Sequence, residues 1–383
     1  MKKIGIHGST GSIGRQALDI IRNDNNLNCI YLTAYSNFEL LIKQAKEFKP
    51  KYVCLVDKTK KKYLYEKLSS YDIEIFTGES GLIEISKCND IDLMLNALVG
   101  YSGMIHTYIA ASNGINIALA NKESLVVAGN LINEKIKLNK SKLFPVDSEH
   151  SAIWQCLEGE KNNFVKNIIL TGSGGPFREL DFSEFSKITK NNALRHPNWS
   201  MGPKITIDSA TMMNKGLEVI EAFWLFDISI DNIEIIVHPQ SIIHSMVEFI
   251  DGSIKAQLGE ASMTIPIHYA LNYPNRKKSI MPKFNLLENP SLTFEKPDLE
   301  KFRCIKLAYD ALKLGDSYPL VLNVVNDICV NAFLNDEINF IDIPNFIDDA
   351  LQSHNACKID DIDSIFNIIN STKNIILRKL DNK

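Results

Sequence analysis

The chain has 383 residues, which is enough for two or three domains and excludes a single small module. Hydrophobic residues make up 45% of it and charged residues 23%, a globular balance that excludes disorder and collagen-like repeats. Lys and Arg number 42 against 46 Asp and Glu, a formal charge of -4 that argues against non-specific binding to nucleic acid.

Seven scattered cysteines form no C-x-x-C pair, which argues against a disulfide framework or a zinc knuckle and favours free thiols in a reducing compartment. The first residues hold no signal-peptide apolar region, and no apolar run approaches the length of a membrane span. We therefore expect a soluble cytoplasmic protein with no membrane partner.

The first 150 residues alternate short β-branched runs with amphipathic stretches. Candidate strands cover 3–7, 28–34, 52–57, 73–76, 91–98, 115–120 and 143–147. Strands that alternate with helices indicate an α/β domain with a Rossmann-like parallel sheet.

The pattern changes after residue 150, and residues 151–285 indicate an α+β domain. Strands are expected at 167–171, 204–208 and 233–238, a helix at 211–226, and a hairpin whose strands 242–250 and 253–258 flank Asp251-Gly252. Prolines make 274–298 an extended segment, with a linker at 286–298. Residues 299–383 are expected to form an α-helical bundle.

A glycine-rich turn, Gly8-Ser-Thr-Gly11-Ser-Ile-Gly14, follows the first strand and opens a helix. Glycines at such a place let a pyrophosphate approach the backbone at the positive end of a helix. The spacing differs from the usual G-x-G-x-x-G, so the alternative is a structural turn with no ligand.

The end of the second strand reads Tyr35-Ser36-Asn37 and lacks the carboxylate that binds the ribose 2′-hydroxyl of NAD. A missing acid removes a repulsion against a 2′-phosphate. The sequence therefore favours NADP, although no nearby arginine supports it.

Three acids suit a divalent cation. Asp147 and Glu149 follow a strand and would point the same way in extended chain, and Glu218 lies within a predicted helix. Oxygen ligands without a thiolate suit Mg²⁺ or Mn²⁺. The alternative is that the first two cap a helix beginning near Ser151 and that Glu218 is helix surface. Spacing alone slightly favours that alternative.

Two further segments suit a phosphate. Gly172-Ser-Gly-Gly-Pro176 follows a strand, and Ser209-Ala-Thr211-Met-Met-Asn214-Lys215 follows another strand and opens a helix. Ser209 or Thr211 could instead be a simple N-cap, which would not explain Lys215. Lys122 and Glu123 also end a strand near the cofactor edge, or else belong to an exposed first helical turn.

These motifs, in this order, closely resemble the 1-deoxy-D-xylulose 5-phosphate reductoisomerase family. The matching stretches are 8–14, 120–126, 146–150, 173–179, 196–221 and 238–248, and the resemblance extends over the helical tail around 322–326. It implies an NADPH-binding domain at 1–150, a catalytic and dimerisation domain at 151–285, a linker at 286–298 and a helical domain at 299–383, assembled as a homodimer.

The implied reaction rearranges the phosphorylated ketose and reduces the product with NADPH to 2-C-methyl-D-erythritol 4-phosphate, in the non-mevalonate route to isoprenoids. It would need one divalent cation, Mn²⁺ or Mg²⁺. A plain NAD(P)-dependent dehydrogenase without the isomerase step is the alternative enzyme. A catalytically silent nucleotide-binding or regulatory protein should lack one or more of the carboxylates that bind the metal, and this sequence has all of them.

The resemblance assigns the site residues. The metal ligands would be Asp147, Glu149 and Glu218, and the catalytic set adds Lys122 and His196. Substrate contacts would be Lys122, Ser148, Glu149, Ser173, His196, Trp199, Met201, Ser209, Asn214, Lys215 and Glu218. Cofactor contacts would be Gly8, Ser9, Thr10, Gly11, Ser12, Ile13, Ser36, Asn37, Asn121, Lys122, Glu123, Gly202 and Met263. Residues 195–203 would form a lid. The sequence departs from the family's pattern at Ser36-Asn37, where many relatives carry a basic residue.

Overall fold

A computed structural model describes residues 1–195, 199, 201–279, 281, 283–289 and 291–381. The contacts divide the chain into two units. The first comprises 1–124, 130–151 and 262–283, and the second comprises 125–129, 152–261 and 284–383. The expected four-part division with boundaries at 150, 285 and 298 stays a prediction.

The first unit is built on a seven-stranded parallel sheet in the order β4-β3-β2-β1-β5-β6-β7. Its strands are β1 (Lys2–His7), β2 (Leu27–Ala34), β3 (Tyr52–Leu55), β4 (Glu74–Thr77), β5 (Leu93–Asn96), β6 (Asn116–Leu119) and β7 (Leu143–Pro145). The expected Rossmann-like parallel sheet is confirmed. Because all strands run the same way, their carboxyl ends share one edge, where ligands bind in this class of fold.

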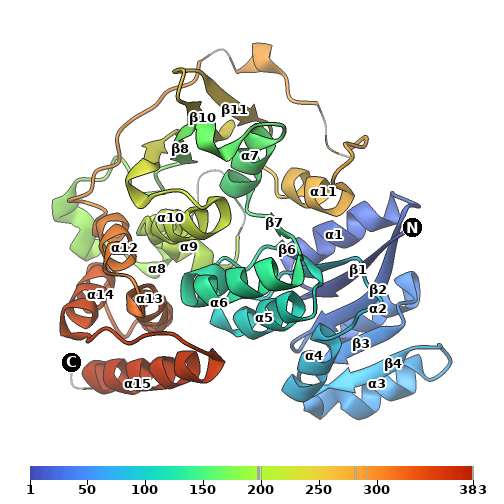
Figure 1. Ribbon diagram of the computed structural model, residues 1–383. Helices are drawn as coiled ribbons and strands as arrows, with labels where there is room; N and C mark the ends of the chain where they lie inside the picture. The colour runs from blue at the N-terminus through green and yellow to red at the C-terminus, as the bar shows by residue number, and fades with distance from the viewer. Residues whose placement is uncertain (196–198, 200, 280, 282, 290, 382–383) are drawn as a thin grey trace. The chain divides into compact units, whose positions relative to one another are not determined.

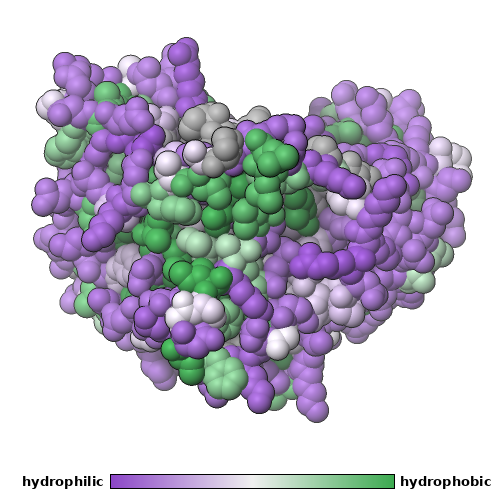
Figure 2. All heavy atoms as spheres, turned by 90° about the horizontal axis from the view of Figure 1, so that it is seen from above, coloured by the Kyte–Doolittle hydropathy of each residue, from purple (hydrophilic) through white to green (hydrophobic). Residues whose placement is uncertain are grey.

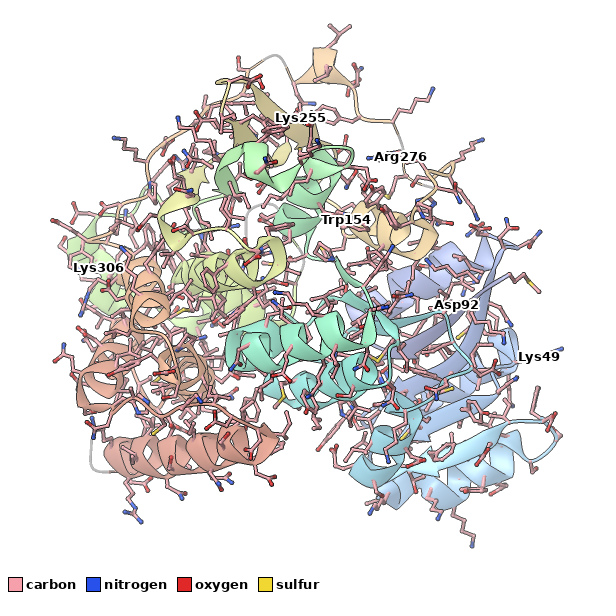
Figure 3. All side chains as sticks on the ribbon, viewed as in Figure 1. Lys49, Asp92, Trp154, Lys255, Arg276 and Lys306 are labelled. Carbon is pink, nitrogen blue, oxygen red and sulfur yellow. The ribbon has the colours of Figure 1, made fainter. Side chains whose placement is uncertain are left out.

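Helices of the first unit follow the strands. They are α1 (Ser12–Arg22), α2 (Phe38–Phe48), α3 (Lys61–Leu68), α4 (Gly78–Ser86), α5 (Met104–Ser112) and α11 (Thr264–Asn272), with the 3-10 turns η1 (Lys58–Lys60) and η2 (Tyr101–Gly103). Helix α6 (Glu123–Asn139) begins here and α7 (Ser148–Leu157) follows β7. Figure 1 shows α1 beside α11 and α4 beside α5, two pairs that pack together. Asp92, labelled in Figure 3, accepts from the N–H of Lys3 at the opposite, amino edge of the sheet.

The second unit has a mixed four-stranded sheet in the order β11-β10-β8-β9. Strands β8 (Val165–Gly172) and β9 (Ile233–Val237) are parallel, whereas β10 (Ile243–Phe249) is antiparallel to β8 and to β11 (Ile254–Leu258). The hairpin expected at Asp251-Gly252 is confirmed, with Gly252 at φ +84°.

Helices complete the second unit. They are α8 (Lys190–Ala193), α9 (Pro203–Ala210), α10 (Met213–Phe226), α12 (Arg303–Leu314), α13 (Tyr318–Leu334), α14 (Asp342–Ser353) and α15 (Ile362–Asp381), with the 3-10 turns η3 (Asn162–Phe164), η4 (Phe182–Lys187), η5 (Ile230–Asn232) and η6 (Leu286–Glu288). The expected C-terminal helices are confirmed. Within the described part of the chain, no helix combines the length and apolar character that crossing a membrane requires.

The strand expected at 204–208 is wrong, because this segment lies in α9. Pro203 occupies the first helical turn, where its missing N–H costs nothing, and Gly202 is the N-cap. Lys204 and Asp208, one turn apart, form an ion pair at 2.6 Å. The alternation of Ile205 and Ile207 with polar residues suggested a strand, but the helix start signal outweighs it.

Candidate functional site

The glycine-rich turn of the first unit needs glycine for steric reasons. Gly8 has φ +79°, and a Cβ there would lie 2.7 Å from the carbonyl oxygen of Ala97. A Cβ on Gly14 would lie 2.4 Å from the carbonyl oxygen of Gly8. Helix α1 therefore starts in direct contact with the turn, and its first N–H groups, which have no partner within the helix, are available to an anion.

Ser9 holds this turn against the second strand. Its buried hydroxyl lies 3.1 Å from the carbonyl oxygen of Thr33 and 2.8 Å from Oε1 of Gln44, and the N–H of Gly8 donates to Oγ1 of Thr33 at 3.0 Å. Ser9 thus shapes the turn from inside. Ser12 is exposed and Thr10 is partly exposed at the surface of the same turn.

Residues 35–37 directly follow β2 and lie at the carboxyl edge of the sheet, as expected. Asn37 caps α2 by accepting from the N–H of Leu40 at 3.2 Å. Tyr35, Ser36 and Asn37 are all exposed, so their side chains are accessible at this edge.

Asn121 organises the next strand ends. Its side-chain amide lies 3.1 Å from the carbonyl oxygen of Leu98, 2.8 Å from that of Gly100 and 2.8 Å from the carboxylate of Glu123. Both Asn121 and Glu123 are buried, which excludes an exposed helical turn. The loop 97–100 after β5 belongs to this edge and was missed, although Gly100 at a strand end signalled a turn.

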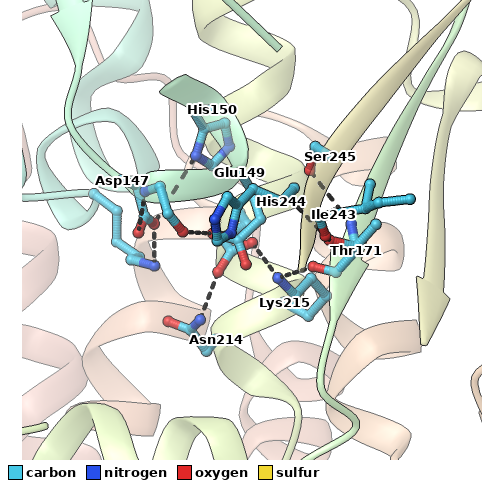
Figure 4. Close-up of polar contacts among 12 residues, drawn as sticks. Asp147, Glu149, His150, Thr171, Asn214, Lys215, Ile243, His244 and Ser245 are labelled. Atoms are coloured by element: carbon cyan, nitrogen blue, oxygen red, sulfur yellow. Dashed lines mark hydrogen bonds and ion pairs between the residues drawn. The ribbon is translucent and has the colours of Figure 1, made fainter. Parts of the chain in front are cut away.

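Lys122 lies against the first of the predicted metal ligands. Its ammonium is 2.5 Å from Oδ2 of Asp147, and Lys122 is buried while Asp147 is partly exposed (Figure 4). The Nδ1 of the buried His150 lies 3.9 Å from the same carboxylate oxygen. His150 was not predicted as a site residue.

Asp147 and Glu149 do not lie in an extended segment. Helix α7 begins at Ser148, so Glu149 belongs to its first turn, where an acid is favourable. The expectation that the two carboxylates point the same way because the chain is extended there is therefore wrong. Ser148 donates a hydrogen bond to the carboxylate of Glu149. Met263 is the N-cap of α11, also in the first unit.

In the second unit, the loop after β8 packs closely on the end of α9. Gly174 and Gly175 have φ +86° and +71°, and a Cβ on Gly175 would lie 2.7 Å from the carbonyl oxygen of Ser209. The hydroxyl of Ser173 accepts from the N–H of Gly175 at 3.3 Å. The structure thus brings the two predicted phosphate-binding segments together.

Lys215 and Glu218 form a buried pair on α10. The Lys215 ammonium lies 2.6 Å from Oε2 of Glu218 and 2.6 Å from the carbonyl oxygen of Thr171, while the Asn214 amide lies 2.5 Å from Oε1 of Glu218 (Figure 4). Their burial excludes an ordinary helix surface for Glu218. A Cβ on Gly172 would come within 2.8 Å of Cε of Lys215, so glycine makes room for the lysine.

Two details of this region differ from the sequence expectation. The segment 209–215 begins in the last turn of helix α9, which ends at Ala210, and follows no strand. Neither Ser209 nor Thr211 is the N-cap of α10, because that position is Met212, in the left-handed region at φ 60°. Glu221 was missed, although its spacing of three from Glu218 indicates the same helix face; it is fully buried.

The expected lid, 195–203, lies partly outside the described residues, and His196 is among those not described. Trp199 and Met201 are partly buried and Gly202 is exposed. The lid stays a prediction.

Comparisons with known proteins agree over nearly the whole chain. Family models match three segments: 1-deoxy-D-xylulose 5-phosphate reductoisomerase at 4–129, its C-terminal domain at 143–226, and a further DXP reductoisomerase C-terminal domain at 258–375. Curated proteins named 1-deoxy-D-xylulose 5-phosphate reductoisomerase from Thermoanaerobacter sp. (strain X514) and Chloroherpeton thalassium are 53% and 50% identical, the first over 99% of both chains and the second over 100% of this chain and 99% of its own.

Solved structures agree. A DOX-P reductoisomerase in complex with NADPH, fosmidomycin and magnesium superposes with a TM-score of 0.94 at 38% identity, covering 100% of this chain and 98% of that one. The Zymomonas mobilis reductoisomerase in complex with NADPH gives 0.94 at 38% identity, covering 100% of both chains. The glycine turn, the strand-end acids and the buried Lys215–Glu218 pair thus lie in a chain that belongs to the 1-deoxy-D-xylulose 5-phosphate reductoisomerase family.

Proposed function

We propose that this protein converts 1-deoxy-D-xylulose 5-phosphate to 2-C-methyl-D-erythritol 4-phosphate, by an intramolecular rearrangement and a reduction with NADPH, in non-mevalonate isoprenoid precursor synthesis. One structural observation carries the proposal. Beside a glycine-rich loop, the buried Lys215 offers a cation for a phosphate and touches Glu218, which offers a carboxylate for a metal. A plain dehydrogenase would not need this pairing.

Asp147 and Glu149 of the first unit, with Glu218 of the second, would hold the divalent cation. The family resemblance assigns all three carboxylates to the metal. An all-oxygen set suits Mg²⁺ or Mn²⁺ better than zinc. When bound, the cation supplies a Lewis acid that polarises the substrate's oxygens and lowers the pKa of its hydroxyl groups.

Two lysines balance these acids from within the protein. Lys122 neutralises Asp147, and Lys215 neutralises Glu218, each by direct contact. A buried or partly buried carboxylate without such a partner would destabilise the folded protein, because its desolvation would not be compensated. Lys122 would also lie between the substrate and the nicotinamide, where its charge stabilises negative charge that develops on the substrate oxygens.

The phosphate of the substrate would bind to Ser173, Ser209, Asn214 and Lys215. Anchoring the substrate by this remote group lets its binding energy orient the reacting carbons. We expect Lys215→Ala to raise the KM for substrate by about ten- to a hundredfold, because a hydrogen bond to a charged group contributes about 1.5 to 3 kcal/mol. The Kd for NADPH would stay unchanged. Equal losses for both ligands would contradict this role.

NADPH would bind along the carboxyl edge of the first unit. The α1 amino end receives the pyrophosphate, and Asn121, Glu123, Gly202 and Met263 are further contacts that the family assigns. NADPH is bound by two relatives of known structure, which supports the assignment. The missing acid after β2 supports NADPH over NADH.

The decisive assay is NADPH oxidation followed by absorbance. We expect oxidation only when 1-deoxy-D-xylulose 5-phosphate and Mn²⁺ or Mg²⁺ are both present, with 2-C-methyl-D-erythritol 4-phosphate as the product. Oxidation without metal, on a simple keto acid, would contradict the proposal and favour a dehydrogenase. A heat-inactivated sample is the control.

The protein would act as a homodimer that pairs through β11. This strand is the edge of the second unit's sheet, and its residues are exposed or partly exposed. Ile250, Ile254 and Leu258 are exposed apolar side chains on this hairpin, next to Lys255, which Figure 3 labels. Figure 2 views the molecule from the side of β10 and β11 and shows hydrophobic residues gathered within a hydrophilic surface. An exposed apolar edge strand is a template for a second copy.

Light scattering at increasing concentration tests the dimer. Ile254→Lys would shift the mass from dimer to monomer, and Leu138→Lys, at another exposed leucine on α6, would not. A monomeric native protein would contradict the proposal.

The protein would function in the cytoplasm. Its seven cysteines are all free thiols, as a reducing compartment favours. Fractionation of cells that express the tagged protein tests this, and recovery in the membrane or secreted fraction would contradict it.

A further inference from the structure

The adenosine end of a dinucleotide lies beside the carboxyl end of β2 in this fold. Here that loop offers Ser36 and Asn37, a hydroxyl and an amide, with no cation. Such groups can hydrogen-bond a 2′-phosphate, but they leave its negative charge unbalanced. A cation for NADPH must therefore come from another element at the same edge.

The chain after β3 runs directly beside this loop. The N–H of Val56 donates to the carbonyl oxygen of Ala34 at 3.0 Å, and the N–H of Asp57 donates to that of Tyr35 at 2.8 Å. The turn η1 follows at once. Asp57 fixes it by accepting from the N–H of Thr59 at 2.9 Å, so the direction of the turn is set by a cap.

Lys60, the last residue of η1, leans toward the loop after β2. Its ammonium lies 5.7 Å from the centre of the Phe38 ring, a cation–π contact. Phe38 directly follows Asn37, and its N–H donates to the carbonyl oxygen of Ser36 at 2.8 Å. The charge of Lys60 thus lies over the ring of the residue that directly follows the two polar residues of the loop.

Lys58 and Lys61 make contacts elsewhere. Lys58 packs against Gly78 after β4, where a Cβ would lie 2.0 Å from its Cε. The ammonium of Lys61 lies 5.6 Å from the centre of the Tyr65 ring on α3. Asp57, the nearby acid, is engaged as the cap: hydrogen bonds from Thr59 and then the charge of Lys60 lower its pKa.

We propose that Lys60, with Ser36 and Asn37, binds the 2′-phosphate of NADPH and sets the preference for NADPH over NADH. The inference rests on the proposed function, since it concerns the cofactor of that reaction. It assigns the selectivity to the segment after β3 and not to the loop after β2 alone.

Calorimetry on the full-length protein tests the assignment with NADPH, NADH and 2′,5′-ADP, a probe that carries the phosphate in question. Lys60→Ala would weaken NADPH and 2′,5′-ADP about tenfold and leave NADH unchanged, because only the first two carry the charge. Lys60→Arg would retain the preference. Lys61→Ala, the matched control on the next residue, would change none of the three affinities.

Salt gives an independent readout. NADPH affinity of the native protein would fall more steeply with ionic strength than that of Lys60→Ala, because one screened charge pair is removed. Unchanged NADPH affinity in Lys60→Ala, or loss in Lys58→Ala instead, would overturn the assignment while the proposed reaction stands. A native protein that binds neither NADPH nor NADH would overturn both.

Discussion

The two units present their ligand-binding groups in opposite ways. In the first, several of the polar groups proposed for the cofactor are exposed, among them Ser12, Ser36 and Asn37. In the second, Lys215 and Glu218, which we propose for substrate and cation, are buried and neutralise each other. Under the proposed function, the glycine turn of the first unit would bind its ligand through exposed backbone N–H groups, whereas Lys215 and Glu218 would bind theirs through charges whose desolvation must be compensated.

Glu218→Gln is expected to have the largest effect. The change removes one metal ligand and the charge that balances Lys215. Mutating a residue that merely hydrogen-bonds to a metal ligand already changes activity ten- to a hundredfold, so we expect metal-dependent turnover to fall at least about a hundredfold. NADPH titration by fluorescence would give an unchanged Kd, because the glycine turn is untouched. Steady-state assays with Mn²⁺ measure the loss, and normal turnover would contradict the metal assignment.

Gly14→Ala is the corresponding change in the first unit. The new Cβ would lie 2.4 Å from the Gly8 carbonyl oxygen and 2.5 Å from Cα of Ser9, so the backbone of the turn must move. We expect NADPH to bind more than about tenfold weaker, a loss comparable to that of a charged hydrogen bond. Calorimetry with a substrate analogue plus metal would show an unchanged affinity for the analogue. Loss of both affinities together would mean that the variant is misfolded.

Acid is expected to destabilise the first unit through two buried histidines. Burial lowers the pKa of His106 to about 4 and that of His7 well below its ordinary value, and Ser86 lies within hydrogen-bond distance of both rings. The unfolded chain binds these protons below about pH 6.5, so stability is present above that pH and falls as the pH drops toward 4. His106 alone would lower the free energy of unfolding by about 2 kcal/mol between about pH 7 and pH 5.

Urea denaturation at several pH values measures this loss. His106→Asn would flatten the pH dependence, and His354→Asn, at a less buried histidine in the second unit, would alter it less. A profile that is the same in His106→Asn as in the native protein would contradict the assignment.

Gly172→Ala is expected to have the smallest effect. Its Cβ would press on Cε of Lys215 at 2.8 Å, and a flexible side chain can shift by a few tenths of an ångström. We expect the KM for substrate to rise about threefold, well below the cost of losing the charged contact, with NADPH affinity unchanged. A change in NADPH affinity alone would contradict the placement of Lys215 in the substrate site.

The first unit could be predicted closely from sequence because its signals are local. β-branched runs, turns and amphipathic stretches follow one another along the sequence. The carboxyl ends of parallel strands lie at one edge of the sheet regardless of loop conformation. The residues after β2, β6 and β7 were located in this way. The loop 97–100 was missed because its role depends on Asn121, a partner 21 residues beyond Gly100 that no local pattern indicates.

The second unit was predicted less well because its site depends on packing. Residues 204–208 alternate like a strand, yet Pro203 starts a helix there. Spacing favoured helix surface for Glu218, and only the buried contacts with Asn214 and Lys215 show otherwise. Burial of a charge pair is a tertiary property, so the family resemblance supplied what periodicity could not.

Under the proposed function, the contact between Lys215 and Glu218 would make the binding of phosphate and of the cation cooperative. A phosphate must compete with the carboxylate of Glu218 for the ammonium of Lys215, which the contact of 2.6 Å occupies. A cation bound to Glu218 would weaken the attraction of this carboxylate for Lys215. The ammonium would then be available to the phosphate. Linkage is reciprocal, so a bound phosphate strengthens the affinity for the cation by the same factor. Under the proposed function, Lys215 and Glu218, three positions apart on α10, would thus couple binding of the cation to binding of the substrate.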